Sequence, residues 1–321
     1  MPKTLMCDPQ LFEKDLNGRT YIVTGANSGS GFATAVQLAR QGAHVIGACR
    51  RVDAGKQAFA ELADLRGTVE IIELDLARLA SVRRFAEAFT SKYDRLHGLV
   101  NNAGIMAPPY GKTEDGFETQ FGVNHLGHFL LTELLLDTLK ASAPSRIVCV
   151  SSVAHQGSKD QMGTIDFDDL NFENRPYDPS VAYTQSKLAN LLHALALARR
   201  LEGTGVSAFS VHPGWIRSNL VKHMAPAWIQ NVLLRPFSGL LGMVSWFEGA
   251  QTTLHCLLAD DAPNHSGEYY SQMSTLYHRK EDRPGGWPMV SPNPNAHETQ
   301  LAEKLYEVSL DLVGLNGTRA T

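Results

Sequence analysis

The stretch Thr24-Gly25-Ala26-Asn27-Ser28-Gly29-Ser30-Gly31 joins an apolar strand-like run, residues 21–23, to an amphipathic stretch, residues 33–40. Glycines at such a turn let the backbone approach a pyrophosphate, and the N-terminus of the following helix favours its negative charge. The spacing, Gly25-x3-Gly29-x-Gly31, differs from the usual dinucleotide fingerprint. A tight turn without a ligand is the alternative, but the turn lies where a nucleotide-binding βαβ unit requires it.

The alternation of strand and helix patterns continues from this turn to about residue 211. It predicts βαβ units. We therefore expect a single-domain α/β fold of Rossmann type, with a doubly wound parallel sheet of about seven strands and helices on both faces. The strand candidates are residues 21–23, 44–49, 69–74, 98–100, 146–150, 206–211 and a last one near 267–271. The helix candidates include residues 33–40, 82–89, 129–139, 188–201 and a final helix near 296–313.

No internal repeat or linker divides the 321 residues. We expect residues 1–15 to form an N-terminal extension and residues 16–321 to form the single domain. Within it, the apolar stretch at about 215–247 is expected to be a substrate lid, and about 272–321 a C-terminal tail. The polar stretch 155–180 is a further long loop, and loops of this length in a compact domain are usually functional.

Tyr183 and Lys187 stand four positions apart, which places both side chains on one face of a helix. A phenol loses its proton near pH ~10, and a nearby cation favours the phenolate. The pair is therefore a candidate for proton transfer near neutral pH. Taken alone it is weak evidence, but Ser151-Ser152 and Asn101-Asn102-Ala103-Gly104 each end a strand-like run upstream of it.

Together these motifs resemble the short-chain dehydrogenase/reductase family, in family order from about Leu16 to Ala259. The branch to which the chain is most similar is the retinol-dehydrogenase-like group. The runs that carry this similarity are Val123-Asn124-His125-Leu126-Gly127-His128-Phe129, Ser151-Ser152-Val153-Ala154-His155, Ser186-Lys187-Leu188-Ala189-Asn190 and Glu248-Gly249-Ala250-Gln251-Thr252.

The resemblance implies four catalytic residues: Asn124, Ser152, Tyr183 and Lys187. Ser152, rather than Ser151, would hydrogen-bond the substrate oxygen, and Tyr183 would exchange a proton with it. Lys187 would lower the pKa of Tyr183 and hold the nicotinamide ribose, while Asn124 would complete a polar relay towards solvent. Hydride transfer needs no metal. Three nearby histidines are interpreted as structural because no metal-site spacing joins them: His125, His128 and His155.

The end of the second strand, Ala48-Cys49-Arg50-Arg51, bears on the choice of cofactor. NAD enzymes usually place a carboxylate here for the ribose 2′-hydroxyl, whereas an arginine accommodates the 2′-phosphate of NADP. Cys49 occupies the expected acidic position, so we predict NADP(H) rather than NAD(H). Two solvated arginines are the alternative.

The remaining cofactor contacts are implied by the family. Asp75 borders the adenine by resemblance, although an N-cap to the helix near Leu79 is an equal alternative. Ser30 replaces a commonly apolar family residue, and Ser218 stands where a threonine is common. The residues expected to bind the cofactor are Gly25, Asn27, Ser28, Gly29, Ser30, Gly31, Arg50, Arg51, Asp75, Leu76, Asn102, Ala103, Gly104, Tyr183, Lys187, Pro213, Gly214, Ile216 and Ser218.

Composition excludes several other classes. The chain is 43% hydrophobic and 19% charged, with a net charge of −4, so no nucleic-acid footprint is visible. Its four cysteines lack metal-ligand spacing and indicate a reducing compartment. The first residues lack an apolar stretch of signal-peptide length, and no later run is long and uncharged enough to span a bilayer, so we expect neither a signal peptide nor a membrane-spanning segment. We expect a cytoplasmic protein, with peripheral membrane attachment as the weaker alternative, and a homo-oligomer is compatible with the family.

The predicted activity is an NADP(H)-dependent carbonyl reductase or alcohol dehydrogenase for a small, bulky, apolar substrate resembling a retinoid, a steroid or a long-chain aldehyde. One alternative is a light-dependent protochlorophyllide reductase, but that family has Cys where this chain has Ala189. A second is a catalytically silent nucleotide-binding scaffold, which the intact catalytic set disfavours.

Overall fold

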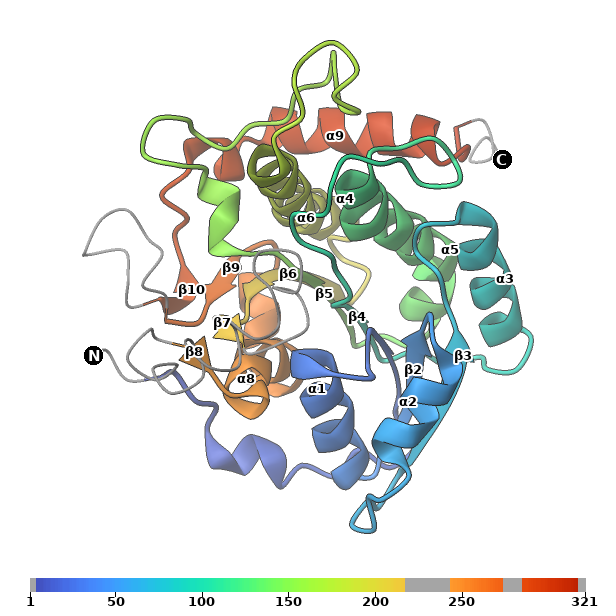
Figure 1. Ribbon diagram of the computed structural model, residues 1–321. Coiled ribbons are helices and arrows are strands. Elements are labelled where there is room, and N and C mark those ends of the chain that lie inside the picture. Colours follow the sequence, from blue (N-terminus) through green and yellow to red (C-terminus); the bar gives the residue numbers. More distant parts are fainter. Residues whose placement is uncertain (1–3, 217–242, 274–284, 317–321) are drawn as a thin grey trace, which may run out of the picture.

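The computed structural model describes residues 4–216, 243–273 and 285–316. Its main sheet has eight strands in the order β10-β9-β6-β5-β4-β1-β2-β3 (Figure 1). All neighbouring strands are parallel except β9 and β10, which are antiparallel. The strands are β1 (Thr20–Thr24), β2 (His44–Cys49), β3 (Thr68–Glu73), β4 (Gly98–Asn101), β5 (Ser145–Val150), β6 (Val206–His212), β9 (Tyr269–Ser271) and β10 (Gly286–Met289), with a separate pair β7 (Trp215–Ile216) and β8 (Met243–Val244).

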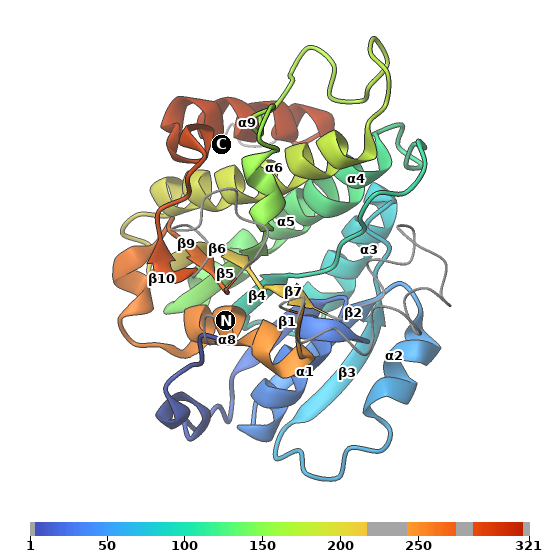
Figure 2. The same cartoon turned by 60° about the vertical axis from the view of Figure 1, so that its left-hand side comes forward.

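Helices cover both faces of the sheet, as Figure 2 shows from the side. One apolar core lies under α1 and α8, and the other lies under α3, α5, α6 and α9. The helices are α1 (Gly29–Arg40), α2 (Val52–Phe59), α3 (Leu79–Thr90), α4 (Thr119–Phe121), α5 (Gly127–Ala141), α6 (Pro179–Arg200), α8 (Trp246–Leu258) and α9 (Thr299–Leu312). Shorter helical turns are η1 (Pro9–Phe12), η2 (Gly122–Leu126), η3 (Val153–Gln156), η6 (Ala262–His265) and η7 (Pro294–His297).

The predicted fold class is confirmed, and seven of the eight strands of the main sheet lie where the apolar runs placed them. The eighth, β10, was not predicted. Its segment Gly286-Trp287-Pro288-Met289 lacks an apolar run, and proline is tolerated in a strand only at the edge of a sheet or at a bulge. β10 is such an edge strand and its register with β9 is irregular.

The strand order indicates at which end of the sheet a ligand would bind. Chain connections run outward from β1 through β2 to β3 on one side, and from β4 through β5 to β6 on the other. Ligands of open α/β sheets bind beyond the carboxyl ends of the strands at such a reversal. Most of the predicted lid, residues 217–242, lies outside the described residues, as do residues 274–284 and 317–321 of the predicted tail.

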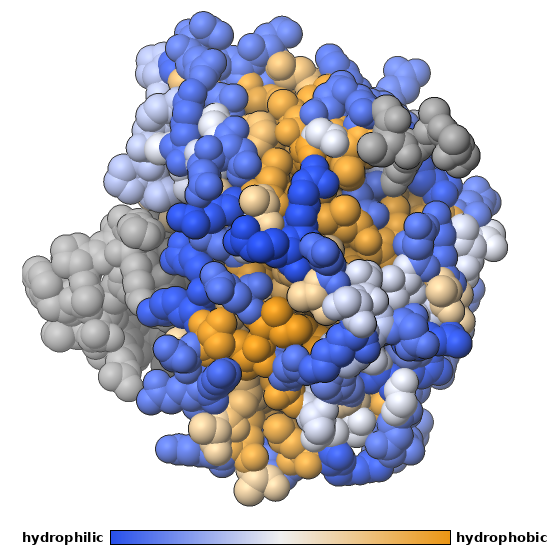
Figure 3. All heavy atoms as spheres, turned by 90° about the vertical axis from the view of Figure 1, so that its right-hand side faces the viewer, coloured by the Kyte–Doolittle hydropathy of each residue, from blue (hydrophilic) through white to orange (hydrophobic). Residues whose placement is uncertain are grey.

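At the edge of the sheet opposite β10, charged side chains protect the edge strand from pairing with another sheet. β3 forms this edge, and its residues are exposed or only half-buried. Glu70 on β3 accepts hydrogen bonds from Lys92 Nζ at 2.8 Å and from the Tyr93 hydroxyl at 2.5 Å. Figure 3 looks onto this side of the molecule, where hydrophilic side chains surround a band of exposed hydrophobic ones. Charged side chains on an edge strand disfavour pairing with another sheet.

The first described residues pack onto the domain. The Cys7 backbone N–H donates to Gln251 Oε1 of α8 at 3.0 Å. The side-chain amide of Gln272 both accepts from the Leu5 N–H and donates to the Leu5 carbonyl, each at 2.7 Å. Within the described part of the chain, no helix is both long and apolar enough to span a membrane.

Candidate active site

The glycine-rich turn is shaped by close backbone contacts. Gly25 and Gly29 adopt φ values of +66° and +62°, in the left-handed region that favours glycine. A Cβ atom on Gly31 would lie 2.4 Å from the Nδ2 atom of Asn102 and 2.7 Å from the carbonyl oxygen of Gly25. No larger residue fits there without movement, so the turn can bring the N-terminus of α1 close to the cavity described below.

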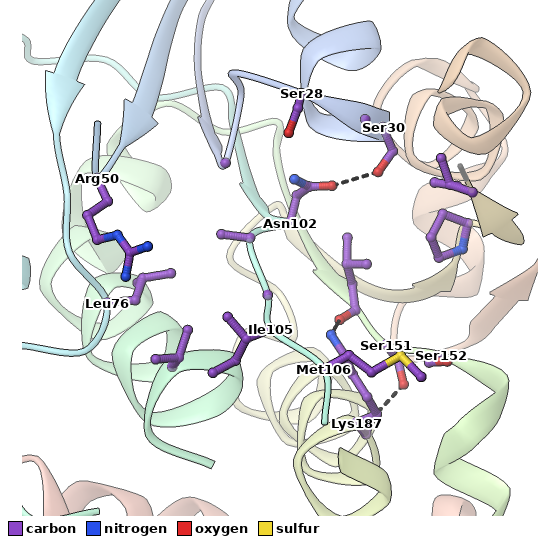
Figure 4. A pocket seen from close by; sticks show the side chains of 18 of the residues that line it. Ser28, Ser30, Arg50, Leu76, Asn102, Ile105, Met106, Ser151, Ser152 and Lys187 are labelled. Carbon is purple, nitrogen blue, oxygen red and sulfur yellow. Dashed lines mark hydrogen bonds between the residues drawn. The ribbon is translucent and has the colours of Figure 1, made fainter. Parts of the chain in front are cut away.

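Asn102, at the end of β4, holds this turn in place. Its amide donates to the Thr24 carbonyl at 2.8 Å, and its Oδ1 accepts from the Ser30 hydroxyl at 2.9 Å (Figure 4). Ser30, the predicted departure from the family pattern, therefore adds a hydrogen bond between the turn and the neighbouring strand end. The Thr24 hydroxyl oxygen accepts from the backbone N–H groups of Asn102 and Ala103, both at 2.9 Å.

One cavity of about 660 Å³ lies beyond the carboxyl ends of the central strands. It contains the glycine-rich turn, the ends of β2, β4 and β5, and the start of the segment after β6. The predicted residues that line it are Gly25, Asn27, Ser28, Gly29, Ser30, Arg50, Arg51, Asp75, Leu76, Asn102, Ala103, Gly104, Ser152, Tyr183, Lys187, Pro213, Gly214 and Ile216. Gly31 packs behind the turn, Asn124 lies beneath the cavity wall, and Ser218 is outside the described residues.

Ser152, Tyr183 and Lys187 line the same part of the cavity. Tyr183 and Lys187 come from the first half of α6, where Asp178 caps the helix through the backbone N–H groups of Ser180 and Val181. Lys187 Nζ lies 5.6 Å from the centre of the Tyr183 ring and donates to the Val150 carbonyl at 3.0 Å. The Ser152 side chain lies close enough to the Tyr183 phenol to lower its pKa.

The two neighbouring serines have different surroundings. The Ser151 hydroxyl donates to the backbone carbonyl of Lys187 at 2.6 Å, and Ser151 is buried. Ser152 is only half-buried, and its oxygen also accepts from the Ala154 N–H at 3.2 Å, which caps η3. Of the two hydroxyls, that of Ser152 is the one available to a molecule in the cavity.

Asn124 is fully buried in the π-helical turn η2. Its amide donates to the Ile105 carbonyl at 3.0 Å and to the Ser186 hydroxyl at 2.9 Å, while its Oδ1 accepts from the Ile105 N–H at 2.9 Å. A Cβ atom on Gly104 would lie 3.2 Å from Asn124 Oδ1 and 3.5 Å from Lys187 Nζ. Asn124 therefore shapes the loop after β4, on the side of Gly104 that also meets Lys187.

Burial controls the proton affinities at this site. It raises the pKa of Tyr183 from 10 to about 12, and the neighbouring Ser152 side chain acts weakly in the opposite direction. Burial also lowers the pKa of Lys187 from 10.5 to about 8. The resemblance implied a lowered pKa for Tyr183. The structure shows the opposite net shift, because the loss of hydration of the phenolate dominates.

The region around the end of β2 is cationic. Arg50 and Arg51 are exposed and line the cavity, and Figure 4 shows the Arg50 side chain extending along it beside Leu76. Cys49, in the position expected for a carboxylate, is buried, and burial raises the pKa of its thiol. Nothing acidic therefore follows β2 directly at this end of the cavity.

Asp75 lines the cavity and does not cap α3, so that alternative is wrong. Its carboxylate accepts from the Ala77 N–H at 3.1 Å, and the Leu79 N–H instead donates to Asp115 at 2.9 Å. The residue before α3 is Arg78. The turn after β3 thus leaves the Asp75 side chain beside the cavity.

The histidines singled out in the sequence are buried in the core. His128 Nε2 lies 2.9 Å from the Thr24 hydroxyl, and His125 Nε2 lies 2.9 Å from the Ser309 hydroxyl. Burial lowers the pKa of His125 to about 3 and the pKa values of His128 and His155 to about 4, so all three are neutral at pH 7. Among the described residues, no cluster of His, Cys, Asp or Glu could hold a metal ion.

Several apolar residues of the cavity wall were not predicted. They follow β4 or lie near η2 and η3, where sequence alone cannot distinguish a cavity wall from core packing. These residues include Ile105, Met106, Val123 and Ala154, together with the polar Thr119. Trp215, at the start of the predicted lid, also lines the cavity.

Comparison with known proteins agrees with this geometry. Residues 19–164 match the family model for short chain dehydrogenases. The chain is 45% identical over 302 residues to retinol dehydrogenase 12 of Homo sapiens, with 94% of this chain and 88% of that protein covered.

Solved structures share the fold. A protein of uncharacterised function from Mycobacterium paratuberculosis is 37% identical, with a TM-score of 0.72, and 94% of this chain and 95% of that one are covered. A Beutenbergia cavernae protein described as an NAD(P)-dependent gluconate 5-dehydrogenase, with bound NADP, is 27% identical with a TM-score of 0.63, covering 80% of this chain and 96% of that one. The chain therefore belongs to the short-chain dehydrogenase/reductase family of oxidoreductases, in its retinol-dehydrogenase-like branch.

Proposed function

We propose that this protein is an NADP(H)-dependent oxidoreductase that transfers hydride between the nicotinamide and the carbonyl or alcohol group of a bulky apolar substrate. The observation that carries the proposal is one continuous cavity. Arg50 and the glycine-rich turn line one part of it, and Ser152, Tyr183 and Lys187 line another. A dinucleotide could thus extend from the cationic end to the proton-transfer group.

The residues around the turn fit the cofactor by their chemistry. The tight glycine turn would hold the pyrophosphate at the N-terminus of α1. Arg50 would bind the 2′-phosphate of NADP through its planar guanidinium, and no carboxylate at Cys49 would compete for the ribose. Asp75 and Leu76 would border the adenine, and Lys187 the nicotinamide ribose. The bound NADP in the Beutenbergia cavernae relative is consistent with this assignment.

The chemistry assigned to the chain's own residues is proton transfer and orientation. The bound nicotinamide supplies or accepts the hydride. During reduction, Tyr183 donates its proton to the substrate oxygen, which Ser152 orients by a hydrogen bond. At a pKa of about 12 the phenol holds that proton at neutral pH. The Lys187 ammonium next to it stabilises the phenolate that remains, and alcohol oxidation reverses these steps.

The apolar part of the cavity supports the substrate class. Ile105, Met106, Val123 and Trp215 line it, and Figure 4 shows Ile105 and Met106 among the side chains of the cavity wall. Apolar walls select substrates through the contact area they bury, at about 25 cal/mol per Å². The name of the human relative, retinol dehydrogenase 12, supports a retinoid-like alcohol or aldehyde, and steroid ketones and long-chain aldehydes share the same chemistry.

Cofactor titration tests the nucleotide assignment. Arg50→Ala should weaken NADPH binding by about 1.5–3 kcal/mol, the scale of a charged hydrogen bond, and leave NADH binding nearly unchanged. Binding is measured by fluorescence titration of both cofactors. The matched control is Arg40→Ala, which removes another surface arginine. Arg40 forms an ion pair with Asp64 at 2.8 Å and does not line the cavity. Equal loss for both cofactors would count against the assignment of Arg50.

A further inference from the structure

His155 connects the loop of Ser152 to a segment far along the chain. It lies in η3, three residues after Ser152, and is fully buried. Its Nδ1 is 2.6 Å from the carbonyl oxygen of Ser152, and its Nε2 is 2.6 Å from the hydroxyl of Ser291. In Figure 1, η3 follows β5, and the segment between β10 and α9 that contains Ser291 passes beside it.

The partners of the ring determine its protonation. A carbonyl oxygen can only accept, so Nδ1 carries the proton and donates to Ser152. A neutral imidazole then has an acceptor at Nε2, and the Ser291 hydroxyl donates to it. The Ser291 oxygen in turn accepts from the Asn293 N–H at 3.2 Å. In this series of hydrogen bonds His155 donates to Ser152, Ser291 donates to His155, and Asn293 donates to Ser291, so every donor faces an acceptor.

Other contacts hold the ring and its loop in this position. The amide of Asn293, which is 2% exposed, donates to the carbonyls of His155 and Gly163 at 2.9 and 3.0 Å. The ring packs edge-on against Tyr269 of β9, with centres 5.0 Å apart. Burial lowers the pKa of His155 to about 4, and the neighbouring His297 acts in the same direction. The ring is therefore neutral near pH 7, so Nε2 keeps the lone pair that accepts the hydrogen bond from Ser291.

We propose that His155 is a positioning residue for the reaction. As the neutral Nδ1–H tautomer, it fixes the Ser152 carbonyl and so the placement of the Ser152 hydroxyl in the cavity, with Ser291 and Asn293 holding it from the C-terminal region. This inference rests on the proposed function of Ser152 and extends it to three residues that do not line the cavity.

Kinetics of carbonyl reduction with NADPH test the role. His155→Phe should lower kcat by about 10- to 100-fold, the scale of a small misplacement, with the NADPH Kd changed at most a few-fold. His155→Asn should restore much of the loss, because its amide nitrogen reaches the position of Nδ1. His155→Gln, whose amide reaches the Nε2 position, should not. Equal activities of the Asn and Gln variants would overturn the assignment.

A matched pair of serines separates positioning from general packing. Ser291 and Ser309 each lie within hydrogen-bond distance of Nε2 of a buried histidine, His155 and His125 respectively. Ser291→Ala should lower kcat, whereas Ser309→Ala should leave it near the wild-type value. Equal effects of the two substitutions would overturn the proposal. The milder Ser291→Ala also serves if thermal unfolding shows that His155→Phe does not fold.

A double substitution tests whether His155 acts through Ser152. In a Ser152→Ala background, His155→Phe should cost little further activity, because residues that act as a unit are not additive. A full additional loss would contradict the proposal. If Ser152→Ala itself retains wild-type kcat, the proposed role of Ser152 fails first, and the role of His155 in the reaction fails with it.

The tautomer can be measured independently of activity. Nitrogen-15 NMR of the imidazole rings, with His155→Phe to identify the His155 signals among the 12 histidines, reports which nitrogen carries the proton. We expect a protonated Nδ1 and no titration between pH 5 and 8, the range in which an unperturbed histidine titrates. A proton on Nε2, or a titration in that range, would overturn the assigned geometry.

Discussion

Tyr183 and Lys187 show how burial prepares two titratable groups in opposite directions. Tyr183 is 7% exposed and Lys187 is 3% exposed, so both charged forms lose hydration. The phenol therefore keeps its proton at neutral pH, as a proton donor for reduction must. The Lys187 ammonium loses its proton more readily than an ammonium in water does.

The residue with the sharpest expected effect is Tyr183. Tyr183→Phe removes the proton donor and preserves most of the packing. We expect kcat to fall by about 10²–10⁴, the usual contribution of a positioned acid, with NADPH affinity within a few-fold of wild type. Steady-state kinetics and cofactor titration measure the two quantities. A variant that keeps near-wild-type kcat on a good substrate would exclude Tyr183 as the donor.

We expect the buried ammonium of Lys187 to lower the free energy of unfolding of the protein. Its pKa falls from 10.5 to about 8 on folding, so between these values the unfolded chain binds more protons than the folded one. The free energy of unfolding therefore rises with pH through this window, and at pH 7 it is lowered by about 3 kcal/mol.

Lys187→Met should raise the free energy of unfolding at pH 7 by about 1–3 kcal/mol and abolish turnover. The lost hydrogen bond to Val150 reduces the gain, but the Val150 carbonyl still accepts from Asn190 at 3.0 Å. Urea unfolding of the protein without cofactor at pH 7 and pH 10 measures the difference, which should shrink at the higher pH. A variant less stable than wild type at pH 7 would contradict this account.

At the scale of elements, the junction of β1 and α1 is the most constrained. Gly31→Ala would force a Cβ atom to 2.4 Å from Asn102 Nδ2 and 2.7 Å from the Gly25 carbonyl. We expect a loss of about 1–3 kcal/mol in unfolding free energy, together with weaker NADPH binding. Gly286→Ala is the matched control, because its nearest neighbour would lie at an ordinary 3.5 Å. Urea unfolding that finds the two variants equally stable would refute the proposed constraint.

The elements that sequence predicted well are those whose burial imposes a pattern. β2 has the predicted bounds because its six residues form a largely apolar run that is buried between β1 and β3. α2, in contrast, is short, contains Gly55 and has one buried residue, so its pattern was too weak to identify it. β10 contains Pro288 and pairs irregularly at an edge, and it was missed for the same reason.

The candidate site divides in the same way. Polar residues such as Tyr183, Lys187 and Asn102 were recognisable because their chemistry and spacing are unusual together. Ile105 and Met106 were not recognisable, because an apolar residue just after a strand can equally well belong to the hydrophobic core. The rise in the pKa of Tyr183 also escaped sequence reasoning, since the extent of burial is a property of the assembled fold.

At the scale of the whole molecule, the order of the strands brings these groups together. β1, β2 and β4 contribute the turn, Arg50 and Asn102, while β5 and α6 contribute Ser152, Tyr183 and Lys187. Distant chain segments also join at the site: the region after β10 holds the η3 loop, and the N-terminal residues bind Gln272, whose side chain packs near Gly214. The cavity is thus a product of the complete domain.

The measurement that tests the central claim most directly is cofactor oxidation by the purified protein with a panel of carbonyl substrates. The panel contains retinaldehyde, long-chain aldehydes, steroid ketones and aromatic ketones, each offered with NADPH and with NADH. We predict NADPH oxidation matched by alcohol formation for at least one bulky apolar substrate, with kcat/KM at least about tenfold lower for NADH, the scale of one lost charged contact. No turnover of either cofactor with any substrate, or equal use of NADH, would contradict the account.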